Sequence, residues 1–143
     1  MDNNSETIKS LNELLQGEYM AVESFNNFIF KLENEDIKQI FQEIQKQHRE
    51  NIDNLAHYIQ DIEGQPDENL GMRGKMGDIM VNMDLGLKVD DIEIIEKAIN
   101  GETKGVNMAE KVLRGDLDDR SRDMAGKILE EDRKSIKRLK DLL

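Results

Sequence analysis

The chain has 143 residues, 36% of them charged and 37% hydrophobic, with a formal net charge of −11 at pH 7, and this length predicts one domain, residues 1–143, around a single core. The acidic balance argues against a nucleic-acid partner because it repels phosphate backbones, and a sequence without cysteine has neither disulfides nor thiolate metal sites. The N-terminus has no basic region followed by an apolar stretch, and no apolar run could span a bilayer, so we expect a cytoplasmic protein without membrane contact.

The first predicted helix runs over about residues 5–31, with Ser5 as its N-cap. Its apolar positions alternate at spacings of three and four residues, which is the pattern of a helix that packs in a bundle. One position of this apolar series is polar, because Glu18 stands between Leu15 and Val22.

The second predicted helix starts after Asn34, a favourable N-cap, and runs to Glu63, where Gly64 and the following proline end it. The middle of its apolar face is also polar, and His48 occupies the central position. The two helices form a first pair over about residues 5–63.

A second helix pair is predicted over about residues 89–143, with Asp90 or Asp91 at its start. Its first helix ends before Gly115, and its second begins near Asp118. Each helix again carries one acidic residue at the centre of its apolar face: Glu102 and Asp132.

The connector between the pairs, residues 64–88, contains about 25 residues and is rich in Gly and Met. Helix–helix loops in simple bundles need only about 2–8 residues. A long connector can instead run back along the bundle and make the second and third helices parallel, as in ferritin-like folds. An up-down-up-down topology remains open if residues 74–85 form a satellite helix at one end. Four methionines at helical spacing predict a short amphipathic helix, packed on the bundle or against a partner: Met72, Met76, Met80 and Met83.

An internal repeat relates the two pairs at an offset of 84 residues, the separation of Glu18 and Glu102. The alignment needs no gap and superimposes the apolar positions, two Gly-Glu pairs, two arginines and the caps Asn34 and Asp118. A shared helical period alone would not align the glycines, arginines and caps. The sequence therefore predicts an all-α four-helix bundle of two repeated helical hairpins that pack face to face.

The repeat places four polar side chains at the middle of the four helices. Positions in the middle of helices meet at one level whichever way each helix runs, so we expect one polar layer in the core: Glu18, His48, Glu102 and Asp132. Two carboxylates about 4 Å apart repel by about 4 kcal/mol at an effective dielectric constant of about 20. Because desolvation adds to this repulsion, the layer needs a compensating arrangement.

Three arrangements could compensate the buried charges. In the first, one divalent cation (iron, manganese or zinc) binds the four side chains. In the second, His48 is protonated and pairs with Asp132 or a glutamate, while a remaining carboxyl keeps its proton. Other polar groups and water then complete a metal-free network, with the candidates Asn51, Ser135, Arg49 and Arg133. In the third, the bundle is splayed at mid-height and water reaches the layer.

A dinuclear metal centre is disfavoured by the residues three positions before His48 and Asp132. Carboxylate-bridged centres in bundles use a Glu from each of two helices and Glu-x-x-His from each of the other two. Here the residues that correspond to the bridging glutamates are Gln45 and Leu129.

Several stretches together resemble a bacterial family of uncharacterised ferritin-like proteins, distantly related to rubrerythrins and bacterioferritins: LNELLQGEYMAVESF, MRGKMGDI, INGETKG and ILEEDRKSIKRL. The resemblance covers almost the whole chain in order, and it implies a ferritin-like bundle. In that superfamily glutamates of the first and third helices bind metal, which implies this role for Glu18 and Glu102. The histidine of the second helix corresponds to His48. Asp132 replaces the histidine of the fourth helix, and the bridging glutamates are missing, which departs from oxidase or iron-storage chemistry.

The sequence thus predicts a ferritin-like bundle protein of unknown activity that binds one divalent metal ion in its core layer and no other cofactor. It fits a non-enzymatic protein better than an enzyme. Two alternatives are an iron- or manganese-dependent oxidoreductase acting on oxygen or peroxide, and a structural or interaction module with a metal-free network. A homodimer is the candidate assembly. If the layer is only structural, Glu18→Gln with Glu102→Gln should be neutral or stabilising.

Overall fold

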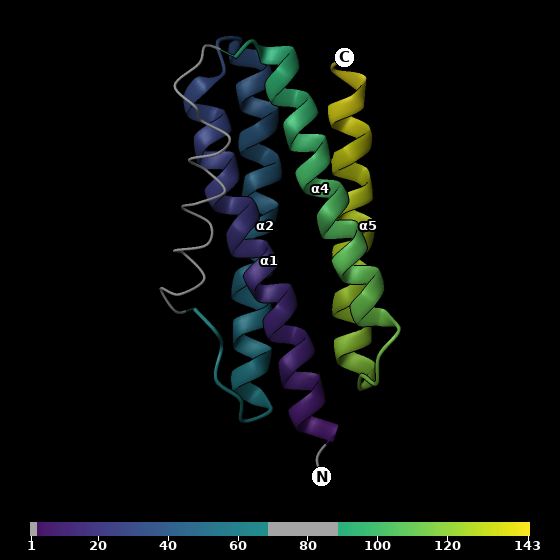
Figure 1. Ribbon diagram of the computed structural model, residues 1–143. Coiled ribbons are helices and arrows are strands. Elements are labelled where there is room, and N and C mark those ends of the chain that lie inside the picture. Colours follow the sequence, from purple (N-terminus) through teal and green to yellow (C-terminus); the bar gives the residue numbers. More distant parts are fainter. Residues whose placement is uncertain (1–2, 69–88) are drawn as a thin grey trace.

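A computed structural model describes residues 3–68 and 89–143. Four helices make up most of these two ranges: α1 (Asn3–Lys31), α2 (Glu35–Asp61), α4 (Asp91–Leu113) and α5 (Asp119–Asp141). They lie side by side as a bundle. The start of α1 and the end of α5 lie at opposite ends of this bundle (Figure 1). The predicted all-α four-helix bundle is confirmed. The predicted methionine helix of the connector lies outside the described residues.

The packing of the helices follows two hairpins. α1 packs along α2, α4 packs along α5, and α1 also lies beside α4. The starts of α2 and α4 lie together, because the Asp91 carboxylate accepts hydrogen bonds from the backbone amides of Glu33 and Asn34, at 3.0 Å each. α2 and α4 are therefore parallel, as the length of the connector predicts, and the up-down-up-down alternative does not apply.

The first residues after α2 already turn back along α1. The Asn12 side chain donates a hydrogen bond to the Gln65 carbonyl at 3.1 Å and accepts one from the Asp67 amide at 2.7 Å. Further along α1, the Tyr19 hydroxyl donates a hydrogen bond to the Glu68 carboxylate. The chain thus begins its return along α1, toward the end of the bundle where α4 starts.

Three of the four helices begin at the predicted caps. The side chains of Asn34, Asp90 and Asp118 accept hydrogen bonds from backbone amides in the first turns of α2, α4 and α5. The predicted cap Ser5 is wrong, since α1 already begins at Asn3. Ser5 therefore lies inside the first turn of α1, whereas an N-cap precedes the first helical residue.

α2 ends earlier than the predicted Glu63, at Asp61. Glu63 has φ = 69°, so this residue, and not Gly64, takes the left-handed conformation that ends the helix. Gly64 is required for a different reason. A Cβ atom at this position would lie 2.9 Å from the side chain of Ile8, so the glycine lets the end of α2 approach α1 closely.

Two apolar clusters form the core, one on each side of the bundle's middle. One contains Leu11, Leu15, Leu55, Ile59, Ala109 and Ile128, and the other contains Phe25, Phe41, Ile44, Ile94, Ile95 and Leu139. Burying a Leu, Ile or Phe side chain stabilises the fold by about 1.5–3 kcal/mol. The clusters therefore hold the helices in register around the polar residues between them. None of the helices in residues 3–68 and 89–143 is long and apolar enough to cross a membrane.

Candidate functional site

Each helix contributes one of the four predicted residues to the middle of the bundle. Their exposed fractions are 5% for Glu18 on α1, 3% for His48 on α2, 2% for Glu102 on α4 and 2% for Asp132 on α5. The side chains therefore meet in the core, as the sequence predicts. All four are at most 5% exposed, so the bundle is not splayed open at this level, although a cavity leads to the layer from one side.

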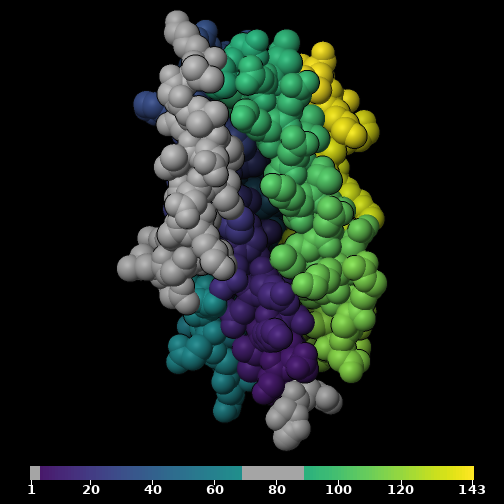
Figure 2. Space-filling model, in the orientation of Figure 1, coloured from purple at the N-terminus to yellow at the C-terminus, as the bar shows by residue number. Residues whose placement is uncertain are grey.

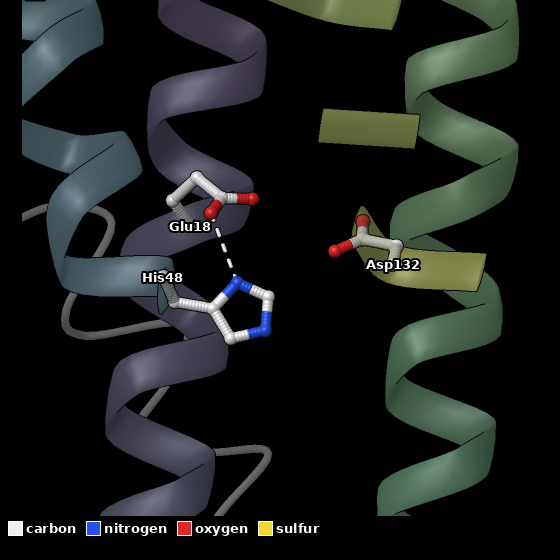
Figure 3. A group of neighbouring side chains, drawn as sticks. All are labelled: Glu18, His48 and Asp132. Atoms are coloured by element: carbon white, nitrogen blue, oxygen red, sulfur yellow. Dashed lines mark hydrogen bonds and ion pairs between the residues drawn. The ribbon is translucent and has the colours of Figure 1, made fainter. Parts of the chain in front are cut away.

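His48 lies between the two glutamates. Its Nδ1 is 2.9 Å from Oε1 of Glu18, and its Nε2 is 3.0 Å from both carboxylate oxygens of Glu102 (Figure 3 shows the Glu18 contact). Asn51, one turn further along α2, donates a hydrogen bond to the same Glu18 oxygen at 2.9 Å. The Phe25 ring packs against the imidazole in an edge-to-face arrangement, with ring centroids 5.9 Å apart. Both ring nitrogens thus face carboxylates, which suits a protonated imidazolium.

Asp132 faces Glu18 and His48 from the opposite hairpin (Figure 3). One ligand atom from each of these three residues lies within 4.8 Å of the other two. Gly105 makes room for the Asp132 carboxylate, since a Cβ atom there would lie 2.7 Å from its Oδ2. Glu102 contacts the other ring nitrogen of His48. The four residues therefore converge, but three of them form the close group.

The electrostatics follow from this geometry. Burial disfavours the charged imidazole, but Glu18 and Glu102 outweigh it and raise the pKa of His48 well above its usual 6.5. Burial and the charges of Glu102 and Glu18 raise the pKa of Asp132 to about 9, from a usual value of 3.8. Without a metal ion, these pKa directions favour an imidazolium between two carboxylates and a protonated Asp132, the charge distribution of the second predicted arrangement.

The residues expected to complete the network divide into two groups. Asn51 belongs to it through its bond to Glu18, and Ser135 is buried one turn from Asp132. The two arginines do not belong. Arg49 is exposed, and Arg133 forms an ion pair with Glu110 at 2.7 Å on the surface. Each arginine follows a core position by one residue, which turns its side chain away from the core.

The sequence analysis missed a fourth acidic residue beside the layer, Glu131. Its side chain is 17% exposed, and its Oε1 is buried without a hydrogen-bond partner among the residues that the structure describes. Burial raises its pKa; a hydrogen bond from Asn51 acts in the opposite direction, and the Glu18 charge raises the pKa further. Glu131 lies outside the apolar series and is four residues after Lys127, so the sequence pattern is that of a surface ion pair.

The two residues at the positions of bridging glutamates, Gln45 and Leu129, make contacts away from the polar layer. Gln45 donates hydrogen bonds to the Val22 carbonyl at 2.9 Å and to the Asn26 side chain at 2.8 Å, so its amide is directed at α1. Leu129 packs against an apolar cluster. The residues present therefore do not fit a dinuclear centre. The close group of Glu18, His48 and Asp132 fits a single ion, since carboxylate and imidazole ligands suit iron, manganese and zinc.

A cavity of about 460 Å³ reaches the polar layer from the surface between α1 and α4. Figure 2 looks onto this face, which is hollowed near mid-height between the green atoms of α4 and the blue atoms of α1. Three glycines contribute to its wall: Gly17, Gly101 and Gly105. At Gly17 and Gly101 the lack of a side chain leaves the space open. Small molecules can therefore approach the layer from this side of the bundle.

A protein-family profile described as a domain of unknown function, DUF2383, matches residues 6–115. No curated protein matches the chain significantly. The fold is similar to that of the bacterioferritin-related protein from Bacteroides fragilis, described as a dodecameric thioferritin. The TM-score is 0.79 at 21% identity, over 99% of this chain and 85% of that chain.

Two further structures share the fold. Ferritin-like, diiron-carboxylate proteins from Bacillus anthracis match with a TM-score of 0.72 at 19% identity, over 100% of this chain and 99% of that one. A two-domain protein from Anabaena variabilis, with DJ-1/ThiJ/PfpI-like and ferritin-like domains, matches with a TM-score of 0.80 at 19% identity. The match covers 97% of this chain but 36% of that protein, so the chain spans about a third of its length. At these identities the likeness shows a ferritin-like four-helix bundle.

Proposed function

Because the chain belongs to the DUF2383 family and folds as a ferritin-like bundle, we propose that it binds one divalent metal ion in its buried polar layer. The observation that carries the proposal is the close group of Glu18, His48 and Asp132, whose ligand atoms lie within 4.8 Å of one another in a buried site. Glu102 lies against the same imidazole and is the fourth candidate ligand. Iron, manganese and zinc are the ions that this donor set suits.

A bound divalent cation would supply the positive charge that offsets the buried carboxylates. His48 must release a ring proton before that nitrogen can act as a ligand, and Asp132 must give up the proton that burial makes it keep. Gly105 leaves the Asp132 carboxylate free to turn toward the ion. Asn51 holds the Glu18 carboxylate in place by donating to its Oε1. Metal uptake at this site is therefore coupled to proton release.

The test is a calorimetric titration of metal-free protein with Mn²⁺, Zn²⁺ and, without oxygen, Fe²⁺. We expect one ion per chain, with affinity rising from pH 6 to pH 8 because binding releases protons and is favoured as the proton concentration falls. Repeating the titration in two buffers with different ionisation enthalpies measures the protons released. Elemental analysis of protein purified without chelators identifies the ion that the site retains.

Two variants make the test specific to the layer. Glu18→Gln with Asp132→Asn removes two ligands and should weaken binding at least 100-fold. Glu130→Gln is the control, since this exposed carboxylate on α5 pairs with Lys134 at 3.3 Å. Equal affinities in the parent and the double variant would contradict the proposal, because the ion would then bind elsewhere.

We also propose that the chain assembles with copies of itself, with a homodimer as the smallest assembly. The support is the Bacteroides fragilis relative, which is described as dodecameric. Light scattering coupled to size-exclusion chromatography gives the mass in solution. A mass of about 16.5 kDa, that of one chain, at all concentrations would contradict the proposal.

A further inference from the structure

The cavity between α1 and α4 has the properties of a binding site in its own right. Its volume of about 460 Å³ falls in the range of about 300–1,000 Å³ that small-molecule sites occupy. Much of its wall on α1 is apolar, formed by Met20, Ala21, Phe25 and Phe28, and Met108 adds an apolar side chain from α4. An apolar wall of this kind would bind the hydrocarbon part of a ligand by removing it from water.

Two lysines on α4 give the cavity a positive flank. Lys97 is half-buried and Lys104 is exposed, and both line the cavity. They are seven residues apart on one helix, which separates them by about 10 Å along its axis. Neither has an ion-pair partner within residues 3–68 and 89–143, whereas Lys111, further along the same helix, is paired with Glu13 at 3.7 Å.

Acidic side chains lie at the buried inner end of the cavity: Glu18, Glu102 and Asp132. The two lysines that line the cavity lie on its α4 side, so an anionic group is attracted to Lys97 and Lys104. In a chain with a net charge of −11, these two lysines, which have no ion-pair partner among the described residues, place positive charge beside the cavity.

We propose that this cavity binds a small amphipathic anion, with its charged group at Lys97 and Lys104 and its apolar part against Met20, Phe25 and Phe28. The proposal does not depend on a metal ion in the layer. The two glycines Gly17 and Gly101 set the available space, because among the described residues no atom lies within 4 Å of a Cβ atom built at either one. Larger side chains at these positions would occupy the cavity without a clash in the native backbone.

The test uses octanoate as the probe, with 1-octanol and octylammonium as neutral and cationic analogues, and metal-free protein kept in a chelator. Isothermal titration calorimetry should show one octanoate per chain at submillimolar affinity. Octanol should bind at least fivefold more weakly, and octylammonium more weakly still. Octanoate that does not bind below 10 mM, or octanol that binds as tightly, would overturn the proposal.

Variants locate the bound anion. Gly17→Leu and Gly101→Leu should each weaken octanoate binding at least tenfold, whereas Gly126→Leu should not. Gly126 is a suitable control because it is also a helical glycine with open space around its Cβ position, but it does not line the cavity. Circular dichroism confirms that each variant is folded.

Lys97→Gln with Lys104→Gln should reduce octanoate affinity to that of octanol and leave octanol binding unchanged. The matched control is Lys111→Gln with Lys127→Gln, two lysines with side chains 64% exposed that do not line the cavity. Equal losses in the two lysine pairs would overturn the assignment of the anionic group. Octanoate binding that is insensitive to both glycine variants would overturn the assignment of the cavity.

Discussion

His48 contacts two glutamates at once, Glu18 through Nδ1 and Glu102 through Nε2. The glutamates lie on opposite sides of the ring, so each is closer to the imidazolium than to the other carboxylate. Attraction therefore outweighs the repulsion between them, which was the dominant effect in the sequence-based argument. Among the described residues, Asp132 forms no ion pair, and burial together with the charges of Glu102 and Glu18 raises its pKa to about 9.

Asp132→Asn should stabilise the metal-free protein by about 1–3 kcal/mol at pH 8, because it removes a buried carboxyl that resists ionisation. The native state holds the Asp132 proton up to a pKa of about 9, whereas the unfolded state loses it near 3.8. Between these values the native state binds more protons, so stability falls as pH rises. Urea midpoints from pH 6 to pH 9 should therefore fall in the parent and fall less in Asp132→Asn. Glu130→Gln should keep the slope of the parent.

Replacing both glutamates should have the opposite effect. Glu18→Gln with Glu102→Gln should destabilise the metal-free protein at pH 6 by about 1–3 kcal/mol, because it removes both charged partners of His48. The pKa of His48 is raised in the folded state, so its contribution is complete below pH 6.5 and is lost as pH rises through the folded pKa. The destabilisation should therefore shrink at alkaline pH. Chemical denaturation at pH 6 and pH 9 checks this, and an increase in stability at pH 6 would restore the original expectation of dominant repulsion.

At the scale of the helices, three glycines of α1 and α4 have different roles. Gly17 and Gly101 border open space, whereas Gly105 makes room for Asp132. Glycine is less favourable than alanine inside a helix by about 0.8–1.0 kcal/mol. Gly17 and Gly101 therefore lower helix stability at the positions where they leave the cavity open.

Gly17→Ala and Gly101→Ala should each stabilise the protein by about 0.8–1.0 kcal/mol, since a single methyl group meets no described atom. Gly105→Ala should gain nothing, because its Cβ would lie 2.7 Å from Oδ2 of Asp132 and displace the carboxylate. It should also weaken metal binding about 10-fold or more, as the loss of groups that orient a ligand does. Denaturant titrations and metal titrations of the three variants check both parts. Equal stabilisation by all three substitutions would show that Asp132 moves freely.

At the scale of the whole molecule, the layer joins the two hairpins. Glu18 and His48 come from α1 and α2, and Glu102 and Asp132 from α4 and α5, so a metal ion bound to the layer would link both halves of the chain. An ion that binds only the folded state stabilises it by about 2.7 kcal/mol at a concentration 100 times its Kd. A rise in stability on addition of metal would therefore show that the ion binds the layer and that its binding stabilises the packing of the two hairpins.

Saturating divalent metal should raise the Tm of the parent protein by about 5–10 °C, from this stabilisation and about 2–4 °C per kcal/mol for a chain of this size. Excess chelator should reverse the shift. Thermal scans by circular dichroism measure it, with Asp132→Asn as the variant that should respond weakly and Glu130→Gln as the control. A shift of the same size in Asp132→Asn would mean that the ion stabilises the protein from another site.

The sequence by itself determined the four helices, two hairpins and the residues of the layer. Helical periodicity places Glu18, His48, Glu102 and Asp132 on apolar faces, and burial of those faces drives the packing. The helix ends were less certain, as Ser5 and Glu63 show, because several residues can end or start a helix equally well.

Only the tertiary structure decided how the polar residues pair. Periodicity gives the face and height of a residue, but not the distances between side chains from different helices. The position of His48 between two glutamates, the half-buried Glu131 and the space beside Gly105 all depend on such distances. The same is true of the cavity, because its walls come from two helices that are distant in sequence. Charge pairing and open space are properties of the packed bundle, whereas the pattern along the chain specifies only which residues take part.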